Sequence, residues 1–283
     1  MMFPFGVQIV AYLFLAGLAA GMALFGSFAP DDAADGTAVG TSVNGGGNGY
    51  ERETPGGRQA IGWAAAFSLA GAAFLVGDLE RPATFSLILF EANPTSAIAW
   101  GARILVVFCL AAVAASLPRG RWSGLDLATL WILRLSAVGL CVYPAFVLRQ
   151  AHAYPLWQSP VLVPLITVSS LHAGACAVAM LGPSPTLFAH TQTAERVLGA
   201  LQLVLALLFM FDAIAAAGAG TAVVTQSPAI FWGAFFAAGT AIPLFAVAFR
   251  PGLAQPLRCA LVVFGSLALR YWLVAAGQAP HAL

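Results

Sequence analysis

The sequence predicts an all-α integral membrane protein with eight transmembrane helices. The first observation is composition: 60% of the 283 residues are hydrophobic and 8% are charged, whereas soluble domains carry about 25% charged residues. The second is the mean hydropathy of +0.89, which indicates that lipid covers much of the surface. The third is that the apolar runs are continuous rather than alternating, which favours helices over a membrane barrel.

Eight apolar stretches are long enough to cross a bilayer, which requires about 20 residues of helix. They cover roughly residues 5–27, 59–78, 97–117, 127–149, 160–182, 195–217, 228–248 and 256–277. No cationic segment precedes the first stretch, so we expect a retained transmembrane helix rather than a cleaved signal peptide. We expect residues 1–283 to form a single transmembrane domain.

The segment between the first two stretches differs in kind. Residues 28–58 contain five acidic residues, two arginines and many glycines, which predicts a flexible, Gly-rich loop insertion. Its GGGNG run follows no strand and precedes no Gly-Lys-Ser/Thr sequence, so a linker is favoured over a phosphate-binding loop.

The arginines predict the orientation, because cytoplasmic loops carry an excess of basic residues. Loops after the second, fourth and sixth spans hold only Arg81 and Arg149. Those after the first, third, fifth and seventh spans hold Arg52, Arg58, Arg119, Arg121, Arg196, Arg250 and Arg258. The latter side, with residues 28–58, should be cytoplasmic, and both termini should then be periplasmic.

A short polar motif ends the second stretch. Asp78, Glu80 and Arg81 interrupt the apolar run, and Pro82 cannot continue a helix, so the motif fixes where this span stops. Asp78 and Arg81 are three residues apart and therefore share one helix face. A charge within a span costs about 2.5–3.5 kcal/mol on insertion scales and usually marks a pathway or a site. Asp78 has no long stem that could reach the interface, which favours a functional role.

The other polar residues of the spans collect mostly towards the predicted periplasmic side. They are Gln8 and Tyr12 in the first span, Arg103 in the third, Tyr143 in the fourth, Asp212 in the sixth, Arg270 in the eighth, and Trp157 just before the fifth. Arg134 lies towards the cytoplasmic side, and His172 lies near mid-depth. Interfacial placement of long side chains and structural ion pairs account for part of this pattern.

Several motifs resemble those of the NrfD/polysulfide reductase membrane-subunit family. They are YLFLAGLAAG in the first span, DLERP followed by NPTSAIAWGARIL between the second and third, YPAF in the fourth, PLWQSPVLVPLITVSSLHAG leading into the fifth, and LRYWLVAAGQ at the end. The matches run from the first span to the eighth, and the DLERP segment is the most specific. The chain departs from the family pattern at Glu80, Pro144, Gln158 and His172.

The resemblance implies a quinone-reactive membrane subunit of eight helices in two four-helix bundles, in a bacterial or archaeal cell membrane. Such subunits serve oxidoreductase complexes of anaerobic respiration, and bind menaquinone or ubiquinone exchangeably near the outer face, without haem. They dock a four-cluster-type iron–sulfur subunit, often with a molybdopterin or multihaem catalytic subunit beyond it. By motif match, Asp78 and Tyr143 correspond to candidate quinone and proton residues. Gln8 and Tyr12 are carried over from their position in the first helix.

The resulting hypothesis assigns roles to the polar residues. A phenol can donate or accept a hydrogen bond, and a carboxylate can take a proton released on quinol oxidation. We expect Asp78 and Tyr143 to bracket the quinone headgroup, with Arg81 and Arg103 tuning Asp78. Beside this pair we expect Gln8, Tyr12 and Trp157. A proton path or charge partners would come from Arg103, Arg134, His172, Asp212 and Arg270.

Other functions remain open from the sequence. A dihaem cytochrome b needs paired histidines at membrane depth, and of His152, His172, His190 and His281 only His172 lies deep in a span. A proton- or ion-coupled transporter without redox chemistry could use Asp212, Arg134 and His172, with a helix break in AAAGAGTAVV. A purely structural anchor is a further alternative.

The cysteines and the net charge argue against two kinds of partner. Cys109, Cys141, Cys176 and Cys259 lie singly in apolar runs, and no Cys-x-x-Cys motif occurs. We therefore expect no metal in this chain. The net charge of +1 and the absence of a basic stripe predict no nucleic-acid partner.

Overall fold

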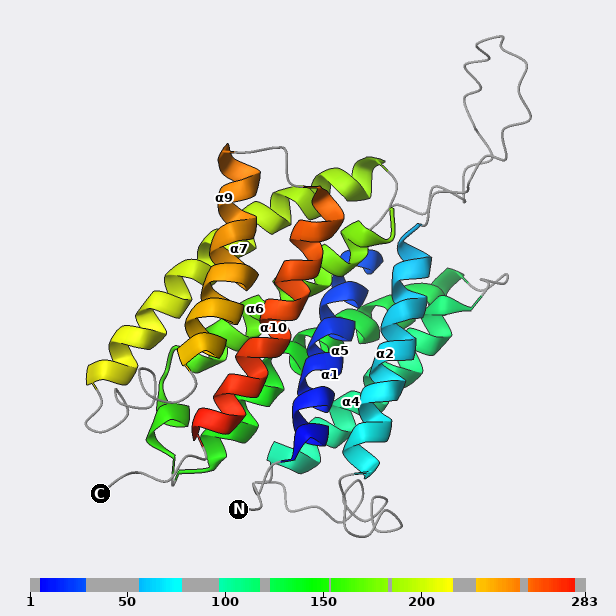
Figure 1. The fold of residues 1–283 in the computed structure, drawn as a ribbon. Helices are drawn as coiled ribbons and strands as arrows, with labels where there is room; N and C mark the ends of the chain where they lie inside the picture. The colour runs from blue at the N-terminus through cyan, green and yellow to red at the C-terminus, as the bar shows by residue number, and fades with distance from the viewer. Residues whose placement is uncertain are drawn as a thin grey trace.

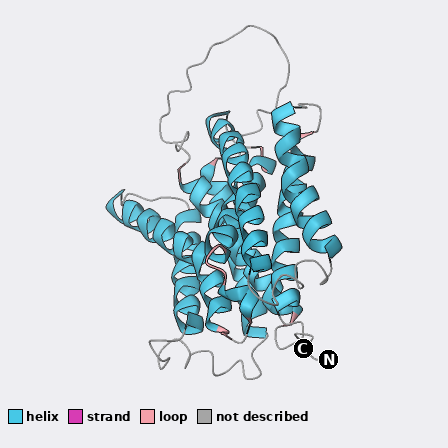
Figure 2. Cartoon of the chain, turned by 90° about the vertical axis from the view of Figure 1, so that its left-hand side faces the viewer, coloured by secondary structure: helices cyan, strands magenta, loops and turns pink. Residues whose placement is uncertain are grey.

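A computed structural model describes residues 6–28, 56–77, 97–117, 123–152, 154–182, 185–215, 228–249 and 254–277. Every regular element in these parts of the chain is helical (Figures 1 and 2). The helices are α1 (Val7–Ser27), α2 (Gly57–Gly77), α4 (Ala97–Ser116), α5 (Ser123–Gln150), η2 (Pro155–Gln158), α6 (Leu162–Met180), α7 (Pro185–Ala215), η3 (Ala229–Ala241), α9 (Ile242–Phe249) and α10 (Gln255–Gly277).

The prediction of an all-helical chain with eight candidate spans is confirmed. Eight helical segments of the described chain are long and apolar enough to cross a membrane, each with a mean hydropathy of at least 1.7. The seventh is composite, because the π-helix η3 continues directly into α9. Helix α1 begins and α10 ends on the same side of the array, which we call the termini side (Figure 1).

The start of α7 differs clearly from the sequence-based expectation. Helix α7 begins at Pro185 rather than near residue 195, so Arg196 lies on a helix and not in a loop. The start of α10 at Gln255 agrees with the predicted span of 256–277, and Arg258, which was counted with the loop arginines, lies inside this helix. The polar first part of α7 can stay helical because a helix satisfies its own backbone groups. Its 31 residues span about 46 Å at 1.5 Å per residue, which exceeds the roughly 30 Å hydrocarbon layer.

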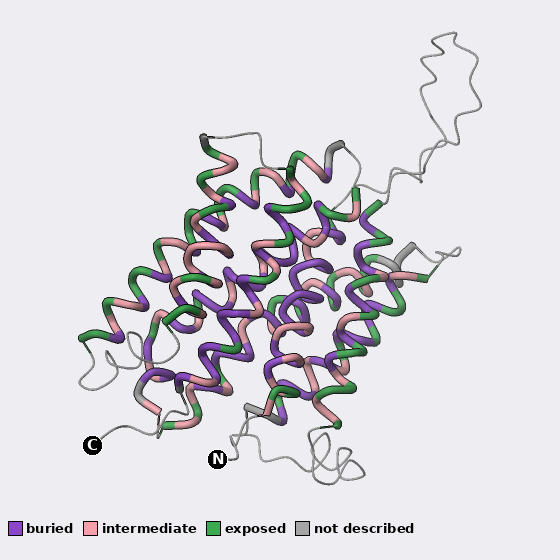
Figure 3. Tube along the Cα trace, in the orientation of Figure 1, coloured by how far each residue is buried: buried purple, intermediate pink, exposed green. Residues whose placement is uncertain are grey.

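The central helices are α1 and α6. About 67% of the apolar window of α1 and 72% of that of α6 are buried, against 28% for α7. Helix α1 packs against α2, α5, α6 and α10. Figure 3 shows buried residues concentrated along the middle of the array and exposed ones along its outer helices. Large exposed apolar side chains, such as Leu110, Leu135 and Phe211, form the surface that lipid would cover.

Glycines set two close helix crossings. Gly21 on α1 faces Gly174 on α6, and a Cβ on either one would collide with the backbone of the other. Gly239 on η3 and Gly265 on α10 meet in the same way. Small residues allow this approach, and van der Waals packing at such contacts drives helix association in membranes.

Candidate functional site

Two buried tyrosines meet near the termini side of the array. Tyr12 on α1 donates a hydrogen bond to the hydroxyl of Tyr143 on α5, with 2.9 Å between the oxygens. Their rings lie 6.4 Å apart at an angle of 57°. Tyr12 is 2% exposed and Tyr143 8% exposed. The sequence predicted both residues, and the structure brings them together across 131 positions of sequence.

Helix α4 holds the Tyr143 ring from one side. Gly101 faces the ring so closely that a Cβ at this position would collide with ring atoms Cε2 and Cζ. Arg103 is half-buried on the same helix, with its guanidinium 5.4 Å from the ring centre of Trp100. Gln8, one turn before Tyr12, is exposed, so its side chain reaches the lipid or water at the rim of the site.

The acidic motif itself lies outside the described residues. Both Asp78 and Arg81 follow Gly77, the last residue of α2. Helix α2 packs against α1 and α4, the helices that carry Tyr12 and Gly101. The predicted pairing of Asp78 with Tyr143 therefore stays a prediction, as does the tuning role of Arg81.

Arg270 joins three helices inside the protein. It is 2% exposed, and it donates to the carbonyl oxygen of Leu13 (3.1 Å), the hydroxyl of Ser170 (2.6 Å), and both the carbonyl oxygen (2.9 Å) and the hydroxyl of Ser266. Ser169 in turn donates to Ser266 at 3.1 Å. Within the described residues, every hydrogen-bond acceptor of Arg270 is a neutral oxygen. Hydrogen bonding of this kind offsets the cost of burying a charge.

His172 belongs to a second buried polar chain. Its Nδ1 lies 3.0 Å from Oε1 of Gln202, whose amide nitrogen donates to the Thr240 hydroxyl at 2.8 Å. Because Gln202 Oε1 can only accept, the Nδ1 of His172 carries the hydrogen. The other ring nitrogen is buried and has no partner in the described chain. This chain links α6, α7 and η3 at mid-depth.

Three further predicted residues lie apart from the tyrosine pair and from one another. Trp157 on η2 is fully buried, and its indole N–H donates to the carbonyl of Leu273 at 2.9 Å. Arg134 donates to the hydroxyl of Ser27 at 3.1 Å and also to its carbonyl oxygen, so it caps the end of α1 opposite the termini side. Asp212 is half-buried near the end of α7.

Sequence reasoning missed several buried polar groups. Glu195 and Arg258 form an ion pair of 3.1 Å and lie near Cys176 and Cys259, as described below. Gln202 interrupts an apolar run and could have been singled out from the sequence. The serines beside Arg270 gave no such signal, because single serines are common in apolar helices.

The family comparison covers nearly the whole chain. The NrfD-type family model described as polysulfide reductase matches residues 5–283, which include both tyrosines and Arg270. Among curated proteins, none matches the sequence. The chain is therefore a multi-pass membrane subunit that belongs to the NrfD/polysulfide reductase family.

Proposed function

We propose that this chain is the quinone/quinol-reactive membrane anchor of a respiratory oxidoreductase complex. It would exchange electrons between the quinone pool and an iron–sulfur partner subunit, with coupled proton release or uptake. The observation that carries the proposal is the buried Tyr12–Tyr143 hydrogen bond of 2.9 Å. The family is one of oxidoreductase membrane subunits. The tyrosine pair lies on α1 and α5, which pack against α2 and α4, the helices before and after the DLERP motif.

The tyrosine pair suits a headgroup that carries two oxygens. Menaquinone or ubiquinone supplies two-electron, two-proton redox chemistry when it is bound. Because Tyr12 donates to Tyr143, the hydroxyl hydrogen of Tyr143 can point to a carbonyl oxygen of such a ligand. The hydroxyl can also accept when the ligand oxygen is protonated. Asp78 would take or supply the proton at this end, with Arg81 and Arg103 as its charge neighbours.

Proton movement beyond the headgroup would use the buried polar groups. Arg270 contacts Leu13 O at 3.1 Å, one residue from Tyr12, so its hydrogen bonds begin next to the tyrosine pair. The His172–Gln202–Thr240 chain lies deeper. Asp212 and Arg134 lie towards opposite ends of the helices. Each would act as a charge partner along the proton path. Gln8, which is exposed one turn before Tyr12, would complete the rim of the site.

The helix contacts support an arrangement in two bundles. Helices α1, α2, α4 and α5 contact one another in a ring, as do α6, α7, α10 and the η3–α9 segment. The arginine distribution supports periplasmic termini in a bacterial or archaeal cell membrane. A four-cluster-type iron–sulfur subunit with a molybdopterin or multihaem catalytic subunit would define the terminal substrate.

A proton- or ion-coupled transporter without redox chemistry is the second candidate. The observation that favours it is the pair of buried polar networks around Arg270 and His172, since intramembrane polar groups often mark ion pathways. The glycine-rich stretch that could break a helix lies outside the described residues. Flux in proteoliposomes that lack redox partners and quinone would favour this alternative.

The test is quinol oxidation by the purified complex carrying Tyr143→Phe, Tyr12→Phe or Asp78→Asn. Tyr271→Phe is the matched control, because Tyr271 is 44% exposed on α10. We expect kcat/KM to fall at least tenfold in Tyr143→Phe and Asp78→Asn, and to stay unchanged in the control. Subunit co-purification checks assembly. Full activity in assembled Tyr143→Phe and Asp78→Asn complexes would overturn the proposed site.

A further inference from the structure

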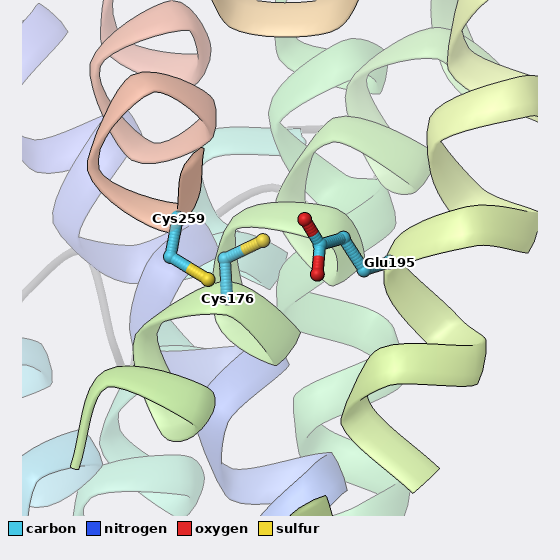
Figure 4. A group of neighbouring side chains, drawn as sticks. All are labelled: Cys176, Glu195 and Cys259. Atoms are coloured by element: carbon cyan, nitrogen blue, oxygen red, sulfur yellow. The ribbon is translucent and has the colours of Figure 1, made fainter. Parts of the chain in front are cut away.

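Two cysteines and a glutamate meet on the side opposite the termini. Cys176 on α6, Glu195 on α7 and Cys259 on α10 place one ligand-type atom each within 4.8 Å of the others. Figure 4 shows the sulfur of Cys259 turned towards Cys176, and the sulfur of Cys176 turned towards the carboxylate of Glu195. All three side chains are buried, at 1%, 4% and 0% exposure. Two thiols and a carboxylate are ligand types that Zn²⁺ accepts.

The charges around this cluster suit a divalent cation. The guanidinium of Arg258 is 8% exposed and pairs with Glu195 through contacts of 3.1 and 3.4 Å. With both thiols protonated, the four side chains are neutral overall. When a metal binds, both thiols lose their protons, and the side chains then sum to two negative charges. One divalent cation restores neutrality, which matters because buried net charge is costly.

The spacing is close to that of a tetrahedral site. Zinc–sulfur bonds of about 2.3 Å and zinc–oxygen bonds of about 2.0–2.2 Å place neighbouring ligand atoms roughly 3.5–3.8 Å apart. The three atoms of the cluster lie within 4.8 Å of one another, so side-chain shifts of about 1 Å suffice. Shifts of this size need no rearrangement of the helices.

A pocket borders the cluster at Glu195, near the end of the helices. It has a volume of about 280 Å³ and is lined by polar groups that include Glu195, Arg196, Gln255 and Arg258. The amide nitrogen of Gln255 is buried and has no partner in the described chain. An ion would reach the cysteines past Glu195, and a water held in the pocket would be the fourth ligand. Gln255 can donate a hydrogen bond to that water.

We propose that Cys176, Glu195 and Cys259 bind a thiophilic divalent cation of the zinc type. Binding exchanges two thiol protons for one metal ion, M²⁺ + 2 R–SH → M(S–R)₂ + 2 H⁺, without any change of oxidation state. The ion links α6, α7 and α10 on the side opposite the tyrosine pair. The inference departs from the sequence-based expectation of no metal, and it does not depend on the proposed quinone function.

The experiment uses Cd²⁺ as the probe, added to the full-length chain in its purified complex under reducing conditions. Thiolate-to-cadmium charge-transfer absorption reports binding through sulfur, and elemental analysis after desalting gives the stoichiometry. The variants are Cys176→Ala and Cys259→Ala. The matched control is Cys141→Ala, which removes a buried thiol on α5 outside the cluster. Thermal unfolding of each protein checks that it is folded.

We expect one Cd²⁺ per chain with the charge-transfer band in the wild type and in Cys141→Ala. Each cluster variant should bind at least tenfold more weakly. Absence of the band in the wild-type chain would overturn the proposal, and this result needs no variant. Equal binding by wild type and folded cluster variants, or a Cys176–Cys259 disulfide in freshly isolated protein, would also overturn it.

Discussion

The contact between Gly101 and the ring of Tyr143 gives the sharpest test of the candidate site. In Gly101→Ala, the new Cβ would collide with ring atoms Cε2 and Cζ of Tyr143. Carbon atoms in contact prefer a separation of about 3.5–4.0 Å, so the ring or α4 must move by about 1–2 Å. The bond of 2.9 Å between Tyr12 and Tyr143 cannot survive such a shift without rearrangement.

The expected magnitude follows from three contributions. Overpacking of a core costs about 1–3 kcal/mol, and loss of a buried hydrogen bond adds about 0.6–1 kcal/mol. Alanine favours a helix over glycine by about 1 kcal/mol, which offsets part of this. We therefore expect Gly101→Ala to lower the free energy of unfolding by about 1–3 kcal/mol. Quinol oxidation should fall by about 10- to 100-fold, because a 1 Å misplacement can cost that much.

Gly62→Ala is the matched control for this change. Gly62 lies on α2, and a Cβ there would meet only the Cβ of Ser116, at 4.0 Å. This variant gains helix propensity without a collision, so it should be as stable as the wild type or slightly more stable. Unfolding of the purified complex and quinol oxidation measure both effects. If Gly101→Ala behaves like Gly62→Ala in both assays, the argument from the Tyr143 contact is wrong.

Three further predictions concern the buried contacts. A double-mutant cycle of Tyr12→Phe and Tyr143→Phe, read by unfolding, should give a coupling of about 0.5–1.5 kcal/mol; zero coupling would contradict the hydrogen bond. Arg270→Met should lower the free energy of unfolding by about 1–3 kcal/mol, because it removes the hydrogen bonds to Leu13 and Ser170 that join α10 to α1 and α6; wild-type stability would show that these bonds contribute little. Gly174→Val should destabilise by more than about 2 kcal/mol, because the side chain forces α1 and α6 apart; normal stability would argue against the close crossing.

The spans could be predicted from sequence because each depends on a local property. A helix in lipid must satisfy its own backbone and present apolar side chains, so runs of apolar residues mark it directly. The start of α7 could not be predicted in this way, because its first eleven residues include His190 and Glu195 and still form helix. Hydropathy marks the part of a helix that lies in lipid and does not mark where the helix begins.

The pairings within the site depend on the register between helices, which no local pattern contains. The motif resemblance singled out Tyr12 and Tyr143, and their direct bond follows from how α1 lies against α5. Cys176 and Cys259 are separated by 83 positions, so sequence spacing could not indicate that they meet. The sequence identifies each polar residue within a span. Only the packing of the helices determines which groups that residue contacts.

Helix α1 connects the packing of the protein to its candidate chemistry. Gly17 leaves room for the Arg270 guanidinium and the Ser170 hydroxyl, which would lie 2.6 and 2.7 Å from a Cβ at that position. Gly21, one turn further on, sets the crossing with α6. Tyr12 lies on the same helix towards the termini side. The small residues that allow close packing therefore also admit the buried charge next to the tyrosine pair. A membrane helix so rich in alanine and glycine can thus hold polar groups in fixed positions, which is what the proposed proton transfer at the tyrosine pair would require.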